Sequence, residues 1–325
     1  MAQALVRGVS PRVTWCPRLQ KHAVVLPSPR HRPGLDGGAR CGYAPRMRFF
    51  IVAVTAALSL AGSADAQQLA VDASHLEPAQ KAAFDKLLAE EVCPCDCPKS
   101  LGQCLLEGTR CAPAVLLAEW AISSFEAGAS PDAIAESLAK EITSGFTAPK
   151  KVPVVAGFAV KGAQKPKHVI VEYADFECGH CRAASAVVEQ LVKKHPEVQV
   201  VFKHFPLSFH AMAKQAASAA EAAGRQGKFW AMHDALFATQ DMLSDELILG
   251  HAKALGLDVA RFTKDLADPE IAKRVEASRA EGMSFGIDAT PAFFVDGRPY
   301  FLHRSVDGFE LRLKMDAARA SSSCN

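Results

Sequence analysis

The sequence contains no apolar run of about 20 residues, the length that a helix needs to cross a membrane, so no membrane-spanning helix is expected. It also contains no internal repeat and no low-complexity tract, so neither a repeat array nor a compositionally biased scaffold is expected. What remains is a chain of 325 residues, 49% hydrophobic and 22% charged. That composition is typical of soluble globular proteins with one large domain or two modest ones.

The chain also lacks a real excess of basic residues. Its formal charge of +2 arises from residues 1–66, which contain nine Lys and Arg residues and two Asp and Glu residues. Subtracting these from the totals of 37 and 35 leaves 28 basic and 33 acidic residues, a net charge of about −5. The sequence beyond residue 66 therefore gives no indication of nucleic-acid binding.

The N-terminal part has the pattern of a targeting segment. A basic start at Arg48, an apolar run over 49–60 and small residues ending at Ala66 together form a secretory signal peptide. We therefore expect a signal peptide at 47–66, cleaved near Ala66, and a periplasmic or secreted protein. A buried apolar helix is the alternative. Residues 1–46, rich in Arg and Pro, are expected to be an over-extended gene start or a disordered extension.

Residues 67–150 show helical patterns and are predicted to form a small all-α module. A first helix is expected over 78–92, with one apolar face formed by Phe84, Leu87, Leu88 and Val92. Ser130, which precedes a proline, is the expected N-cap of a later helix that Gly145 ends. The expected helices of the module lie over 78–92, 113–127 and 131–144, and a linker follows at 147–151.

Eight cysteines follow the expected cleavage site, and in an oxidising compartment they are either paired or redox-active. Five of them belong to the all-α module: Cys93, Cys95, Cys97, Cys104 and Cys111. Three interpretations stay open: structural disulfides, a metal site with Cys93, Cys95 and Cys97 as candidate ligands, or a second redox relay. Because five is odd, either Cys324 pairs with one of them or one thiol stays free.

Beyond residue 151 the pattern becomes mixed α/β. A strand, a helix and a second strand follow one another and predict a β-α-β unit with parallel strands. An Ala-rich helical stretch over 209–285 comes next, and a pair of short strands joined at Asp296-Gly297 precedes a last helix. The expected strands are 152–160, 169–173, 198–205, 292–295 and 298–303, and the expected flanking helices are 182–194 and 305–318.

The motif Cys178-Gly179-His180-Cys181 lies between a predicted strand and a predicted helix. A thiol at a helix N-terminus loses its proton readily, so Cys178 is the expected nucleophile. Cys181 lies one helical turn further on, where it can resolve a mixed disulfide, and a positive charge on His180 can lower the pKa of Cys178 further. The alternatives are half of a zinc site, for which residues 152–323 hold no second pair, and a structural disulfide.

Two further positions are candidates for the same site. Glu172 stands in an apolar strand six residues before Cys178, where burial would raise its pKa and let it exchange protons with Cys181. An edge-exposed carboxylate is the alternative. Thr290-Pro291 precedes a strand, and a cis peptide bond there would place the Thr290 backbone against the disulfide, where it can pair with a substrate chain. A trans turn is the alternative.

These residues resemble the DsbA-like branch of the thioredoxin superfamily over about 152–318. The resemblance is carried by four blocks in the family's order, 169–181, 202–207, 226–234 and 289–297. It implies a thioredoxin fold with a helical insertion at about 209–285 and a domain spanning 151–320. It also implies Cys178 as nucleophile, Cys181 as resolving thiol, Pro291 as the cis-proline and Glu172 as the buried acid. The Gly-His dipeptide is similar to that of protein disulfide isomerase rather than to the Pro-His of DsbA.

The all-α module resembles the helical hairpin of CcmH-like cytochrome c maturation proteins, although its Cys-Pro-Cys-Asp-Cys spacing departs from their Cys-x-x-Cys. The favoured function is a periplasmic thiol–disulfide oxidoreductase that oxidises or reshuffles cysteines in exported proteins. A dithiol reductase in cytochrome c maturation and a non-catalytic peptide-binding or metal-binding module are the alternatives. The favoured function needs no cofactor besides the Cys178–Cys181 disulfide, and it needs a membrane or soluble redox partner for recycling.

Overall fold

The computed structural model describes residues 69–95, 97–106, 111–146 and 150–319, which fall within the unit Ser63–Asn325. The expected extension at 1–46, the expected signal peptide at 47–66 and Cys324 lie outside the described residues. Among the described residues, no helix combines the length and the apolar character that crossing a membrane requires.

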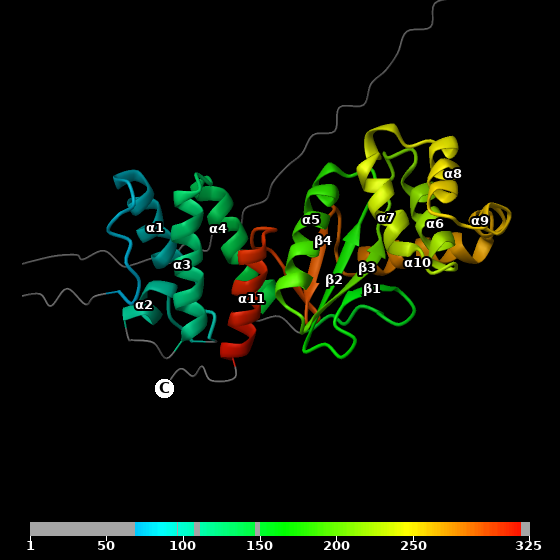
Figure 1. The fold of residues 1–325 in the computed structure, drawn as a ribbon. Coiled ribbons are helices and arrows are strands. Elements are labelled where there is room, and N and C mark those ends of the chain that lie inside the picture. The colour runs from blue at the N-terminus through cyan, green and yellow to red at the C-terminus, as the bar shows by residue number, and fades with distance from the viewer. Residues whose placement is uncertain (1–68, 96, 107–110, 147–149, 320–325) are drawn as a thin grey trace, which may run out of the picture. The chain divides into compact units, whose positions relative to one another are not determined.

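The N-terminal part is built from helices, as the sequence predicts (Figure 1). Its first helix buries Phe84, Leu87 and Leu88. Val92 is 50% exposed, so its predicted place on that apolar face is wrong. The reason is that α1 ends at Glu90, and Val92 instead forms an isolated bridge with Ser100. The helices of this part are α1 (Pro78–Glu90), α2 (Leu101–Leu106), α3 (Ala112–Glu126) and α4 (Pro131–Lys140).

The end of α4 differs from the prediction. Ser130 caps the helix by accepting a hydrogen bond from the backbone N–H of Ala133. The chain then continues as a π-helix, η1 (Glu141–Phe146), so Gly145 does not end a helix. Packing explains the exception, because the buried Arg312 donates from Nη2 to the Gly145 carbonyl at 2.7 Å. A Cβ at Gly145 would also lie 2.8 Å from the Pro299 carbonyl oxygen, so only glycine allows this approach.

A five-stranded mixed sheet in the order β1-β3-β2-β4-β5 forms the second part. β2 and β3 are parallel, which confirms the predicted β-α-β unit, and the other neighbours are antiparallel. The strand predicted over 152–160 begins only at Ala159, because Val154 donates its N–H to the Glu281 carboxylate instead of a neighbouring strand. The strands are β1 (Ala159–Gly162), β2 (His168–Ala174), β3 (Val198–His204), β4 (Ala292–Val295) and β5 (Arg298–Tyr300).

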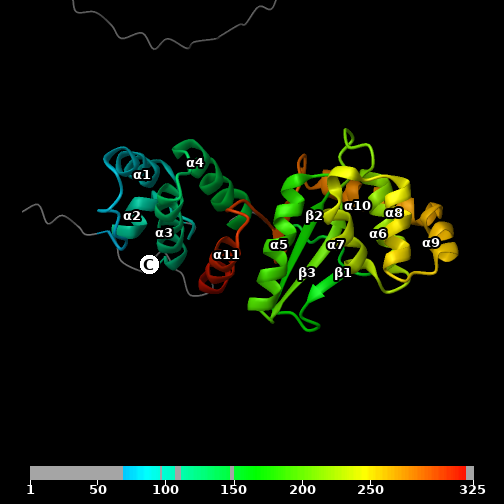
Figure 2. The ribbon, with the colours of Figure 1, turned by 45° about the horizontal axis from the view of Figure 1, so that its top comes forward.

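Helix α5 (Gly179–Lys194) connects β2 to β3, and a helical insertion connects β3 to β4 (Figure 2). The insertion buries alanines along α6, whose small side chains let neighbouring helices approach closely. Its helices are α6 (Ala213–Gly224), α7 (Phe229–Ala238), α8 (Asp245–Ala254), α9 (Val259–Leu266) and α10 (Pro269–Ser284), with a 3-10 turn η2 (Gln240–Met242) after α7. This confirms the predicted thioredoxin-type α/β fold with a helical insertion.

The last helix, α11 (Val306–Arg319), packs against both α3 and α5. Arg312, which has no exposed surface, projects from it and pairs with the equally buried Glu141 carboxylate of η1. The other Glu141 oxygen accepts the Phe301 N–H at 2.8 Å, and Arg312 Nε donates to Asp316 at 2.9 Å. Paired and hydrogen-bonded in this way, the two charges are tolerated inside the protein.

Candidate active site

The two cysteines of the motif stand at the start of α5. Cys178 is the N-cap residue of this helix, and its carbonyl accepts hydrogen bonds from the N–H groups of Cys181 at 3.0 Å and Arg182 at 3.2 Å. The β-strand before the motif and the helix after it therefore place Cys178 where unpaired N–H groups and the helix dipole favour negative charge. Both cysteines are unbonded, so the structure shows the dithiol form.

Cys178 is strongly acidic for a thiol. Its pKa falls to about 5, chiefly because the Cys181 thiol hydrogen-bonds to it, with Thr290 and the backbone N–H groups of Cys181 and His180 acting in the same direction. These interactions outweigh burial, which opposes ionisation; the side chain is 8% exposed. Cys178 is thus a thiolate at neutral pH and more accessible than Cys181, which is fully buried.

The Cys181 thiol has the opposite character. Burial raises its pKa far above the ordinary range, and the hydrogen bond that it gives to Cys178 acts in the same direction. Its sulfur also accepts the Asp175 N–H at 3.5 Å. One thiolate and one protonated thiol side by side form an asymmetric pair, as a nucleophile and its resolving partner require.

Thr290 faces the nucleophile from the loop before β4. The peptide bond between Thr290 and Pro291 is cis, as the sequence analysis predicts, and the Thr290 carbonyl oxygen lies 3.4 Å from Cys178 Sγ. The Thr290 side chain is buried, and its Oγ1 has no hydrogen-bond partner among the described residues. The segment thus brings both a backbone carbonyl and a hydroxyl to the reactive sulfur.

Glu172 is buried in β2, so the alternative of an edge-exposed carboxylate is wrong. Desolvation raises its pKa to about 8, while the positive charge of Lys161 acts in the opposite direction. One carboxylate oxygen, Oε1, has no hydrogen-bond partner among the described residues. The Glu172 charge also raises the pKa of Cys181. A carboxyl with a pKa near neutral in electrostatic contact with the resolving thiol can take up or release its proton.

The His180 side chain is exposed at the start of α5. The contribution that His180 makes to the low Cys178 pKa comes through its backbone N–H. The effect predicted for a charged imidazole therefore stays a prediction.

Sequence reasoning missed the residues that hold the cysteine loop in place. The buried Asp175 carboxylate accepts hydrogen bonds from the N–H groups of Glu177 at 2.8 Å and Leu207 at 2.7 Å, and contacts His210 Nδ1 at 2.8 Å. Gln240 Nε2 donates to the Phe176 carbonyl at 2.8 Å. The Asp175–Glu177 contact is a local Asx turn, which the aspartate's position could have indicated. The contacts that Leu207 and His210, after β3, and Gln240, in η2, make with this loop span many residues, so no local sequence pattern indicates them.

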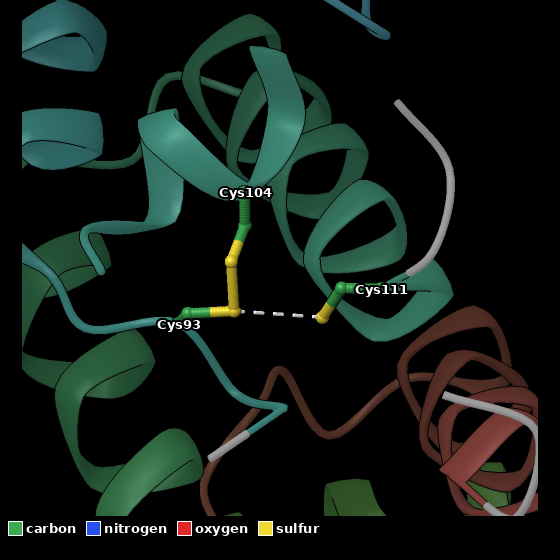
Figure 3. A group of neighbouring side chains, drawn as sticks. All are labelled: Cys93, Cys104 and Cys111. Carbon is green, nitrogen blue, oxygen red and sulfur yellow. Dashed lines mark hydrogen bonds between the residues drawn. A yellow bond between two sulfur atoms is a disulfide. The ribbon is translucent and has the colours of Figure 1, made fainter. Parts of the chain in front are cut away.

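The cysteines of the helical part form a separate cluster (Figure 3). Disulfides join Cys93 to Cys104 and Cys95 to Cys111, and Cys97 is disulfide-bonded as well. The expected disulfides are therefore observed for these residues, and the interpretation as a redox relay, which would also form disulfides, stays a prediction. Cys93, Cys95 and Cys97 are not metal ligands in this oxidised form, because zinc and other soft metals bind the thiolate.

Comparison with known proteins identifies the second part of the chain. Residues 156–314 match the family model described as Thioredoxin. Together with the observed sheet and insertion, this match confirms the predicted thioredoxin fold with a helical insertion. Among solved structures, the chain is similar to a thioredoxin-like oxidoreductase from Silicibacter pomeroyi DSS-3, with 30% identity and a TM-score of 0.45, covering 51% of this chain and 94% of that one. It is also similar to Pseudomonas aeruginosa DsbA2, with 28% identity and a TM-score of 0.44, covering 54% and 100%.

Curated relatives match over a similar length. They include Na(+)/H(+) antiporter NhaA 3 of Salinispora tropica, 42% identical over 43% of this chain and 22% of that protein. Another is Na(+)/H(+) antiporter NhaA of Herminiimonas arsenicoxydans, 38% identical over 49% and 25%. The chain thus spans about a quarter or less of these relatives, and antiport is not carried over from so short a match.

Proposed function

We propose that the chain is a thiol–disulfide oxidoreductase that exchanges disulfides with exported proteins through Cys178 and Cys181, because residues 156–314 match the thioredoxin family model. One observation carries the proposal, the pairing of two thiols of opposite character at the start of α5. The pKa of Cys178 is lowered to about 5, whereas that of the adjacent Cys181 is raised, and Cys178 Sγ lies 3.4 Å from the Thr290 carbonyl oxygen. That pairing supports exchange chemistry and argues against a purely structural or peptide-binding role.

In the oxidising direction, a substrate thiolate attacks the Cys178 sulfur of the Cys178–Cys181 disulfide. The bond between the two cysteines breaks, a mixed disulfide forms, and Cys181 leaves as a thiolate that takes a proton. A second substrate thiolate then attacks the mixed disulfide and displaces Cys178. Two electrons pass from the substrate to the cysteine pair, and the substrate gains a disulfide. The stabilised Cys178 thiolate is a good leaving group, which favours this direction.

The buried Glu172 serves the proton step. Cys181 is too deep to exchange its proton with bulk water directly, because its side chain is fully buried. With a pKa of about 8, the Glu172 carboxyl can supply a proton to the departing Cys181 thiolate and accept it in the reverse reaction. Thr290 presents backbone to an extended substrate chain next to the mixed disulfide. An isomerase reaction starts instead from the reduced pair: the Cys178 thiolate attacks a substrate disulfide, the freed substrate thiolate attacks a second disulfide of the same protein, and a substrate thiolate finally displaces Cys178, with no net transfer of electrons.

We place this activity in the periplasm or outside the cell, as the expected signal peptide at 47–66 and the disulfides of the helical part support. Such an enzyme needs a membrane or soluble redox partner that restores its disulfide. A reductase that supplies electrons to cytochrome c maturation is the second candidate. The helical part, which resembles CcmH-like proteins, favours it.

Trapping of the mixed disulfide tests the proposal. The oxidised wild-type chain is mixed with a reduced, unfolded peptide that contains two cysteines, and disulfide formation in the peptide is followed by mass spectrometry. A Cys181→Ser variant, activated at Cys178 as a mixed disulfide with a small thiol, should accumulate a one-to-one adduct with a one-cysteine form of the peptide, which has no second thiol to release Cys178. The matched Cys178→Ser variant should form no adduct and no peptide disulfide. Full activity of Cys178→Ser would overturn the proposal.

The reduction potential separates the two candidates. An oxidase or isomerase should lie well above the value of about −270 mV that is typical of thioredoxin. A value at or below it would favour the reductase.

A further inference from the structure

Two disulfides of the helical part lie next to each other, with one sulfur atom of each in contact. Cys93 is bonded to Cys104 and Cys111 to Cys95, yet the sulfurs of Cys93 and Cys111 lie only 3.7 Å apart although no bond joins them. The three sulfurs of Cys93, Cys104 and Cys111 all lie within 4.8 Å of one another, and all three residues are buried (Figure 3). None of them takes part in the chemistry proposed for Cys178.

The backbone holds this group together independently of the disulfides. The N–H of Cys93 donates to the Lys99 carbonyl at 3.0 Å, and the N–H of Leu101 donates to the Glu91 carbonyl at 2.7 Å. These bonds close the loop that carries Cys93. Cys104 belongs to α2, and Cys111 is the N-cap residue of α3. The sulfurs would therefore stay close to one another after their disulfides are reduced.

We propose that reduction of the Cys93–Cys104 and Cys95–Cys111 disulfides converts this group into a zinc site, with Cys93, Cys104 and Cys111 as ligands and Cys95 as the fourth. Each disulfide takes two electrons and two protons from a reducing dithiol, which becomes a disulfide in turn. Zn²⁺ then binds the four sulfurs and displaces the thiol protons to solvent. The site is closed to metal when the disulfides are formed and open when they are reduced.

The spacing of the sulfurs suits this metal. In a tetrahedral zinc site with zinc–sulfur bonds of about 2.3 Å, neighbouring sulfurs are about 3.8 Å apart. The contact between Cys93 and Cys111 already has this spacing, at 3.7 Å. The sulfurs of Cys93 and Cys104 need only separate once their bond is cleaved. Thiolate ligands select soft or borderline ions such as zinc over calcium or magnesium.

The local electrostatics favour thiolates at this place. Cys111 caps the N-terminus of α3, a helix of 15 residues, where the helix dipole stabilises negative charge. Cys95 is partly exposed, which gives an ion a way in from solvent. The inference uses only residues of the helical part and does not depend on the function proposed for Cys178.

Zinc binding to the full chain tests the inference. The Cys178→Ser/Cys181→Ser variant serves as the background, because it removes the other dithiol that could bind zinc. After anaerobic reduction with a phosphine and removal of the phosphine, one Zn²⁺ per chain should bind in competition with a chromophoric chelator. The oxidised chain should bind none. Co²⁺ in place of zinc should give thiolate-to-metal charge-transfer bands, which report sulfur ligation whatever the fold of the reduced chain.

Single variants decide which sulfurs bind. In the same background, Cys104→Ser and Cys111→Ser should each weaken zinc binding by more than about 100-fold, the upper end of what loss of a supporting residue costs. Cys97→Ser is the matched control from the same segment and should keep the zinc. The inference is overturned if the reduced chain binds no zinc, if the oxidised chain binds it equally, if Cys111→Ser retains it, or if Cys97→Ser loses it.

Discussion

Raising the pH should lower the reduction potential of the Cys178–Cys181 pair by about half of the usual amount per pH unit. A disulfide that is reduced to two thiols takes up two protons with its two electrons, which corresponds to about 59 mV per pH unit. With a pKa of about 5, Cys178 stays ionised from there upward, whereas the high pKa of Cys181 keeps that thiol protonated. Only one proton is then taken up, and the expected slope is about 30 mV per pH unit.

The low Cys178 pKa also contributes to the free energy of unfolding of the reduced protein. The shift from the ordinary thiol value of 9.0 to about 5 covers four pH units. At about 1.4 kcal/mol per unit this stabilises the folded dithiol form by about 5 kcal/mol. Because the folded pKa lies below the unfolded one, this stabilisation is complete above pH 9 and is lost as the pH falls through about 5. Above pH 9 the potential is then more oxidising than that of an unshifted thiol by about 120 mV, and at pH 7 by about 60 mV.

Equilibration with glutathione buffers between pH 4 and pH 9 measures the potential, and the thiolate absorbance of the reduced protein gives the Cys178 pKa independently. The slope should steepen towards about 59 mV per pH unit below pH 5, where both sulfurs bind protons. The Glu172→Gln variant is the control, because it removes the other group that titrates near neutral pH and should leave the slope at pH 6 unchanged. A slope of about 59 mV between pH 6 and pH 8 would refute the assignment of a thiolate to Cys178.

Two further predictions concern buried charges. Glu172→Gln should flatten the pH dependence of the free energy of unfolding. The raised pKa of Glu172 gives stability that is complete below pH 4.5 and is lost as the pH rises to about 8, a difference of about 5 kcal/mol. Urea unfolding of wild type and variant side by side measures this difference. Failure of the two curves to diverge with pH would contradict it. Arg312→Met should cost about 3–5 kcal/mol because it leaves the Glu141 carboxylate buried and unpaired. Adding Glu141→Gln should recover part of the lost free energy of unfolding. No recovery would mean that the unpaired Glu141 carboxylate does not cause the loss.

Local sequence patterns predict much of this fold because they reflect local physics. The buried strand expected from residue 169 to 173 and the helix start at Cys178 depend on neighbouring residues, and both are observed. The strand expected over 152–160 fails for the opposite reason. Its valines have strand character, but Val154 bonds to Glu281, 127 residues away, and only β1 from Ala159 pairs with the sheet. The π-helix at Gly145 likewise depends on Arg312, 167 residues further along.

The same distinction applies to the site. The motif at 178–181 and the apolar surroundings of Glu172 are visible in the sequence. The pairing of Cys93 with Cys104 and of Cys95 with Cys111 is not, because several pairings are compatible with any set of five cysteines. The influence of Lys161 on Glu172 also required the structure, since β1 and β2 are not neighbours in the sheet.

Helix α11 connects the thioredoxin-type sheet to the helical part energetically. Its Phe309 stacks on Tyr300 of β5 with ring centroids 4.4 Å apart, and meets Phe293 of β4 at 5.1 Å. The same helix packs on α3 and directs Arg312 to Glu141 of η1. Removal of the helical part would therefore expose one face of α11 and leave a buried arginine without its carboxylate. The predicted boundary at 150–151 divides the sequence by composition, but the free energy of folding is shared across it.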